Sequence, residues 1–221
     1  GIDRQAIIDS VLLGQGMAAY GPLQRNIYND PDVAHYDYDP EKAKTILEDA
    51  GCTMSENGFY ERNGKEIGFV ISVMAGEQDR IDIAQAAAQQ LRDIGINCTV
   101  DIPAQMDWGG QMACLIGWGS PFDADDHTYK VFGTDKGANY SGYSNAAVDS
   151  YLKLARETSD PEQRRQYYAK FQEALAAYAF ICYIDANYVA VDGLQGIAAD
   201  TVLGHHGVGI FWNVQEWTIE K

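Results

Sequence analysis

The feature that most constrains the fold of this chain is a strand–helix–strand pattern between residues 66 and 102. Residues 66–74 have the character of a strand, and residues 96–102 alternate apolar and polar side chains. Between them, apolar residues recur at helical spacing up to Gly95. Two strands joined through a helix pair in parallel with a right-handed crossover. The pattern therefore predicts an α/β protein with a mixed sheet flanked by helices.

Capping residues mark the starts of further helices. Asp3 precedes an apolar-periodic helix, and Asp39 and Asp160 each precede a proline, the pairing typical of an N-cap and the first helical residue. A fourth helix is expected over residues 146–157. The apolar positions expected to face the core in the last three are Ala43, Ile46, Leu47, Ala50, Val148, Leu152, Ala155, Tyr168, Phe171, Leu175 and Tyr178.

Two further stretches predict local structure. Asn63-Gly64 lies between residues of strand character and predicts a tight hairpin. Near the end of the chain, a strand is expected over residues 180–191, followed by a glycine-rich loop at 204–213 and a final short strand.

Composition limits the possible functions. The chain has 221 residues and a net charge of −16, which disfavours nucleic acid and anionic membrane surfaces as partners. No stretch is apolar for long enough to be a transmembrane helix. The four cysteines, Cys52, Cys98, Cys114 and Cys182, are far apart and lie in or beside apolar runs, so we expect buried free thiols. No motif implies a cofactor.

The stretch from Gly117 to Asn145 is the best candidate for a binding site. It begins with a Gly-Trp-Gly turn after an apolar run, and then brings an aromatic residue, a proline, three carboxylates and a histidine close together. Such a composition is typical of a loop that leaves a strand and carries ligand-binding groups. The alternative is an acidic surface loop over one buried tryptophan.

The residues also allow two other kinds of site, a hydrolase active site and a transition-metal site. Asp123, Asp125 and Asp126 could serve a hydrolase, but acid–base pairs need carboxylates across a cleft rather than neighbours on one loop. The Gly-x-Ser-x-Gly motif is absent, so we expect no catalysis. His205 and His206, with His127, could bind a transition metal. Adjacent histidines on an extended segment point to opposite sides, which disfavours a shared ion.

Several motifs, taken in order, resemble a known family. They are residues 2–7, Gly21-Pro22-Leu23, the segment from Tyr36 to Gly51, Ile94-Gly95-Ile96, Gly117-Trp118-Gly119, residues 140–145 and residues 160–165. The chain resembles the C-terminal part of the dipeptide-, oligopeptide- and nickel-binding extracellular solute-binding proteins, the receptor subunits of ABC importers. The likeness covers nearly all of the chain.

The resemblance implies one lobe of a two-lobed, periplasmic-binding-protein-like fold that closes over a small solute. Residues 1–221 would be the C-terminal ligand-binding lobe of a longer protein, with residues from about 192 to 221 packing toward the missing N-terminal lobe. The chain begins within a helix, which agrees with a fragment. Its partners would be a peptide-like solute, that missing lobe and the permease subunits. It would lie outside the cell or in the periplasm, anchored as a lipoprotein through the missing N-terminus.

The resemblance leaves two kinds of ligand open. Peptide-binding members place an Asp a few residues after the Trp, where this chain has Ser120 or Pro121, so Asp123 is the candidate substitute. The nickel-binding branch is closer around Trp118, but has Tyr where Phe122 stands and His where Lys136 stands. A peptide is the first expectation and a metal chelate the alternative. The expected ligand-binding residues are Trp118, Ser120, Phe122, Asp123, Asp125, Tyr140, His205, His206 and Trp212.

Overall fold

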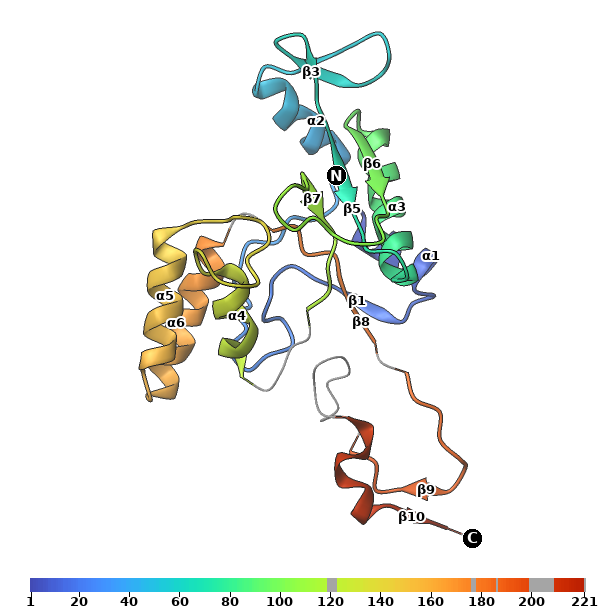
Figure 1. Ribbon diagram of the computed structural model, residues 1–221, viewed down its shortest axis with the longest axis vertical. Helices are drawn as coiled ribbons and strands as arrows, with labels where there is room; N and C mark the ends of the chain where they lie inside the picture. The colour runs from blue at the N-terminus through green and yellow to red at the C-terminus, as the bar shows by residue number, and fades with distance from the viewer. Residues whose placement is uncertain (119–122, 176–177, 186, 199–208, 221) are drawn as a thin grey trace. The chain divides into compact units, whose positions relative to one another are not determined.

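The chain forms two compact units in a computed structural model that describes residues 1–118, 123–175, 178–185, 187–198 and 209–220. The first unit contains residues 1–18 and 35–117, and the second contains residues 19–34 and 118–221 (Figure 1). No sequence feature predicted this division. The assignment of the chain to a single receptor lobe stays a prediction.

A parallel three-stranded sheet is the centre of the first unit. Strand β5 (Gly68–Ser72) lies between β6 (Asn97–Asp101) and β7 (Ala113–Cys114), with Ile71 opposite Val100 on one side and Ala113 on the other. Helix α3 (Gln78–Asp93) connects β5 to β6. The predicted strand–helix–strand unit and its parallel pairing are therefore confirmed.

The core of the first unit lies between α3 and this sheet. It contains Ile71, Val73, Ile81, Ala84, Ala88 and Cys98. Small alanines on α3 let the helix approach the sheet closely. On β6 the expected apolar face is only partly realised: Cys98 is fully buried, but Ile102 follows the end of the strand and is exposed.

The predicted helix starts of the first unit are confirmed. In α1 (Arg4–Val11), Asp3 accepts a hydrogen bond from Ala6 N at 2.9 Å. In α2 (Pro40–Asp49), Asp39 accepts one from Lys42 N at 2.9 Å, and Gly51 follows with a positive φ of 82°. Both caps satisfy backbone donors of the first helical turn, which have no partner within the helix.

The buried stripe predicted for α2 is wrong. The structure describes all of α2, and none of its residues is buried. Ile46 is 58% exposed and Ala50 is exposed, while Ala43 and Leu47 are half-buried. The helix is amphipathic, but the core of this unit is already filled between α3 and the sheet. Helix α2 packs at the side, where Glu48 accepts a hydrogen bond from the Tyr60 hydroxyl at 2.9 Å.

The predicted hairpin is confirmed within a small antiparallel sheet of β2 (Thr53–Met54), β3 (Tyr60–Arg62) and β4 (Lys65–Glu66). Asn63 and Gly64 both have positive φ, 54° and 70°, as a type I′ turn requires. Tyr60 is buried and contacts Gly95, where a Cβ would lie only 2.9 Å from the tyrosine ring. Only glycine fits there, because it combines that approach with a φ of 90°.

The core of the second unit is formed by the α-helices α4 (Ala124–Phe132), α5 (Ala146–Glu157) and α6 (Pro161–Ala174). Asp160 caps α6 as predicted, accepting from Glu162 N at 2.9 Å and Gln163 N at 3.2 Å. Leu23 joins their core from the early segment of the chain. The buried cluster is Leu23, Ala124, Val131, Phe132, Val148, Leu152, Ala155, Tyr168 and Phe171, while Leu175 and Tyr178 pack against it partly buried.

The last part of the chain has short elements. The strand predicted over residues 180–191 is limited to β8 (Cys182–Ile184), and β9 (Leu194–Gln195) pairs antiparallel with β10 (Thr218–Ile219). Residues 210–213, expected in the glycine-rich loop, instead begin a 3₁₀ helix, η2 (Ile210–Glu216), while residues 204–208 lie outside the described residues. In η2 the buried Asn213 donates to Gly196 O at 2.8 Å and accepts from Trp217 Nε1 at 2.9 Å.

The short strand β1 (Gly16–Ala18) follows α1.

The cysteines are free thiols. Cys52 and Cys98 are buried as predicted, whereas Cys114 and Cys182 are only half-buried. Within the described part of the chain, no helix has both the length and the apolar character needed to cross a bilayer.

Candidate ligand-binding site

Three aspartates of the candidate stretch, Asp123, Asp125 and Asp126, lie at the start of a helix. Because α4 begins at Ala124, Asp125, Asp126 and His127 are helical, and the prediction of an acidic loop is wrong for them. Asp123 is the N-cap and accepts from Asp125 N at 2.9 Å. Acids in the first turn interact favourably with the helix dipole. The same residues that indicated a binding loop are thus also a helix-start signal.

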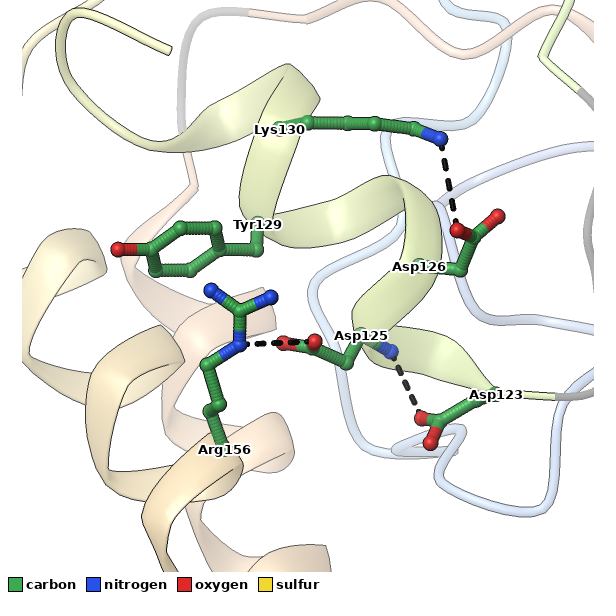
Figure 2. Close-up of a pocket in the computed structure, with 6 residues that line it drawn as sticks. All are labelled: Asp123, Asp125, Asp126, Tyr129, Lys130 and Arg156. Carbon is green, nitrogen blue, oxygen red and sulfur yellow. Dashed lines mark hydrogen bonds and ion pairs between the residues drawn. The ribbon is translucent and has the colours of Figure 1, made fainter.

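Two of these aspartates form ion pairs with neighbouring helices. Asp123 Oδ1 lies 2.6 Å from Arg164 Nη2 on α6, and Asp125 Oδ2 lies 3.0 Å from Arg156 Nε on α5. Figure 2 shows the second pair, with the Arg156 guanidinium 3.9 Å from the centre of the Tyr129 ring. These contacts fasten the N-terminal end of α4 to α5 and α6.

An open hollow of about 370 Å³ lies beside this end of α4 (Figure 2). Its lining residues are Asp123, Asp125, Asp126, Tyr129, Lys130 and Arg156. Asp126 pairs with Lys130 at 3.5 Å, so each aspartate in the hollow has a cationic partner. The three carboxylates on which the hydrolase alternative depended are therefore all engaged in ion pairs, two of which join helices.

His127 lies on the buried face of α4. It is only 5% exposed and bonds to the Pro22 carbonyl, and burial lowers the pKa of its imidazole. Among the described residues, no three His, Cys, Asp or Glu side chains come close enough to hold a metal ion. His205 and His206, the other residues of the metal hypothesis, lie outside the described residues.

The structure brings together two of the predicted binding residues that are distant in sequence. The rings of Trp118 and Tyr140 are stacked, with centroids 6.0 Å apart and planes inclined by 22°. Both side chains are half-buried, and Trp118 packs against the core of the second unit. Two aromatic faces held in a fixed arrangement, and still partly accessible, are suited to contact a small organic ligand.

Five other predicted residues are not placed beside this pair by any described contact. Ser120 and Phe122, like the two histidines, lie outside the described residues. Trp212 is in η2 and is 49% exposed. The site prediction as a whole thus stays a prediction.

Arg80 is a candidate that sequence reasoning missed. It lies in the first turn of α3, beyond the carboxyl end of β5, and pairs with Glu77 at 3.0 Å. A Cβ at Gly117 would lie 2.7 Å from Arg80 Nη2, so the guanidinium rests on this glycine. Open α/β sheets bind ligands at the carboxyl ends of their strands. The available signal was an arginine just after a strand of a strand–helix–strand unit.

A comparison with known families decides the relationship. The sequence pattern of the "Bacterial extracellular solute-binding proteins, family 5 Middle" matches residues 1–140. The chain belongs to this family.

Individual proteins similar to this family 5 chain support the same assignment. The oligopeptide-binding protein AppA of Bacillus subtilis is 29% identical over 100% of the chain and 42% of its own length, and Protein XP55 of Streptomyces lividans is 32% identical over 89% of the chain and 38% of its own. Among solved structures, NikZ of Campylobacter jejuni in complex with Ni(L-His) is 36% identical with a TM-score of 0.85, over 98% of this chain and 46% of that one. AppA in complex with a nonapeptide has a TM-score of 0.74 at 27% identity, over 100% of this chain and 46% of that one.

These comparisons confirm the expected family and the α/β, periplasmic-binding-protein-like fold. The family 5 chain spans less than half the length of the relatives it matches. The family consists of extracellular solute-binding proteins, so its members are receptors.

Proposed function

We propose that this family 5 chain is part of the solute-binding receptor of an ABC importer and captures a peptide or a similar small solute outside the cell. The observation that carries the proposal is the match of residues 1–140 to a family of extracellular solute-binding proteins. The likeness to AppA, an oligopeptide-binding protein, supports a peptide as the solute. The chain acts by binding, and it catalyses no reaction.

In the second unit, Trp118 and Tyr140 form the aromatic part of the proposed site. Asp123 and Asp125 are already paired with arginines, so an amine bound to them joins an existing ion pair rather than an isolated carboxylate. We therefore expect these acids to contribute less than the aromatic pair. Ser120, Phe122, His205, His206 and Trp212 complete the proposed set.

Residues 1–221 are proposed as the C-terminal ligand-binding lobe of a two-lobed receptor. The segment from about 192 to 221 packs toward the N-terminal lobe, and the exposed apolar side chains of Phe211, Val214 and Ile219 support this role. Further partners are the permease subunits. The receptor works in the periplasm or at the cell surface, anchored as a lipoprotein through its N-terminus.

A chelate of nickel with an amino acid is the second candidate ligand. The observation that favours it is the likeness to NikZ, at 36% identity over 98% of this chain, because that structure contains Ni(L-His). Lys136 departs from the pattern expected of a nickel-chelate receptor, since the nickel-binding branch has a histidine at this position.

Calorimetric titration of the whole receptor, the chain together with its N-terminal lobe, distinguishes the candidates. The probes are tri-alanine, a nonapeptide and nickel with L-histidine. We expect a peptide to bind with a Kd near or below about 1 μM and to be recovered intact by mass spectrometry. Binding of nickel with L-histidine alone favours the second candidate.

Variants locate the site in the same titration. Trp118→Ala should weaken binding about 5- to 30-fold, because a partly buried aromatic contact of this kind contributes about 1–2 kcal/mol. The matched control is Trp108→Ala in the first unit, which should leave the Kd unchanged. If no probe binds, or if the two variants bind alike, the proposal is contradicted.

A further inference from the structure

The loop between α4 and α5, residues 133–145, carries Tyr140 and is bridged by the side chain of Asn139. Asn139 Nδ2 donates to Gly133 O at 2.9 Å and to Tyr143 O at 2.7 Å. Asn139 Oδ1 accepts from Ser141 Oγ at 2.9 Å and from Tyr143 N at 3.2 Å. A single amide therefore ties together backbone on both sides of Tyr140.

A second set of contacts fixes this loop to the core. Ser141 Oγ lies 2.8 Å from the Tyr178 hydroxyl, and the Tyr178 ring meets the Phe132 ring edge-on at 4.7 Å. The Tyr143 hydroxyl donates to Ala174 O at 3.3 Å, at the end of α6. The residues next to Tyr140 are thus anchored to the helices against which Trp118 packs.

We infer that Asn139 is a positioning residue that holds the Tyr140 ring against Trp118, and that it sets ligand affinity through this ring. Its role in affinity rests on the proposed function. An amide is required because the position uses two donors and an acceptor at once. Aspartate would place a carboxylate against two carbonyl oxygens, and alanine would remove the bridge between the two flanks of Tyr140. A loop held in its binding arrangement avoids the free energy of ordering when ligand arrives.

The positioning can be tested on the 221-residue chain without ligand, by NMR of the tryptophan indole N–H groups. The Trp118 signal is identified by its loss in Trp118→Phe. Tyr140→Leu should shift this signal, and Asn139→Ala should shift it to nearly the same position. The matched control is Thr134→Val, which removes the bond of Thr134 to Ser144 in the same loop and should leave the signal in place.

Two outcomes of this measurement would overturn the inference. One is a Trp118 signal that stays at its original position in Asn139→Ala. The other is an unchanged signal in Tyr140→Leu, because the two rings are then not in contact. Loss of the folded spectrum in Asn139→Ala is resolved by Asn139→Asp, which keeps the bonds accepted from Ser141 and Tyr143, removes the two donated bonds and should shift the signal part of the way.

A double-mutant cycle on the whole receptor tests the effect on affinity, with whichever of tri-alanine, the nonapeptide or nickel with L-histidine binds. Asn139→Ala alone should raise the Kd about ten-fold, as expected when about a tenth of the molecules hold the competent arrangement. In a Tyr140→Ala background it should have no further effect. Full additivity would contradict action through Tyr140. Binding that Trp118→Ala and Tyr140→Ala both leave unchanged refutes the proposed site instead, while the NMR result still decides the positioning.

Discussion

Asp125 and Asp126 are neighbours on α4, yet their surroundings differ. The side chain of Asp125 is 17% exposed and contacts Arg156 on another helix, whereas that of Asp126 is 58% exposed and reaches only Lys130, one turn along the same helix. A pair that joins two helices through a carboxylate largely shielded from water contributes more to stability than an exposed pair within one helix.

We therefore predict different effects of the same substitution at these positions. Asp125→Asn should lower the free energy of unfolding by about 1 kcal/mol, because Arg156 then loses its charged partner. Asp126→Asn should change it by less than about 0.5 kcal/mol. Urea unfolding of the two variants gives both values, and equal losses would mean that the helix-joining contact adds nothing.

His127 should make stability depend on pH. Burial holds the pKa of its imidazole below the ordinary value, against the opposing effects of the Pro22 carbonyl and Asp126, while Lys130 adds to the lowering. As pH falls below about 6.5, the unfolded chain binds a proton that the folded chain does not. The stability that the buried, neutral His127 contributes is therefore fully present above about pH 6.5. It is lost as the pH falls toward the lowered pKa of the folded state. Urea midpoints at pH 7.5 and 5.5 measure the loss. His127→Gln should reduce it, and the exposed His35→Gln should not.

Sequence reasoning found the residues of the candidate site more readily than their partners. Trp118 and Tyr140 were both predicted, and they are stacked. However, nothing in the sequence indicated that Arg156 and Arg164 would meet Asp125 and Asp123, because these contacts span 31 and 41 positions. Partners of this kind depend on how helices cross, and local composition holds no information about that.

At the scale of elements, a substitution on helix α2 tests directly whether its apolar face is exposed, as the structure shows, rather than buried. Ile46→Ala should change the free energy of unfolding by less than about 0.5 kcal/mol, as is usual for an exposed position. The same substitution at Ile83, which is 2% exposed on α3, should lower it by about 2–5 kcal/mol. Thermal or urea unfolding compares the two. A large loss for Ile46→Ala would show that α2 has a buried face after all.

Local signals predicted the elements well, and for a physical reason. Caps such as Asp39 and Asp160, and the Asn63-Gly64 turn, act through backbone groups only a few residues away. Burial of a helix face, in contrast, depends on which other elements pack against that face. The apolar period of α2 resembles that of α5, but only α5 has other helices against its apolar face. The α4 helix was missed because its acidic first turn was interpreted only as a binding loop.

At the scale of the whole molecule, we predict that the 221-residue chain binds its solute weakly by itself. The chain spans 42% of the length of AppA, and we propose that the solute is held between this chain and an N-terminal lobe. If the whole receptor binds at about 1 μM, or about −8 kcal/mol, loss of half the contacts should move the Kd to about 1 mM or weaker. Calorimetry of the chain alone should show little heat. Micromolar binding would place a complete pocket within these residues.

The contribution of Leu23 to the core of the second unit also has a consequence for synthesis on the ribosome. Leu23 is fully buried among side chains that end with Phe171, about 150 residues later. At about 5–20 residues per second, this leucine emerges roughly 7–30 s before the last of its neighbours exists. The first unit, complete by residue 117, can fold during that interval. Residues 19–34 belong to the second unit, so they must meanwhile stay outside the folded first unit, with the side chain of Leu23 exposed to water. A chaperone that binds exposed apolar side chains therefore has this early segment available during synthesis.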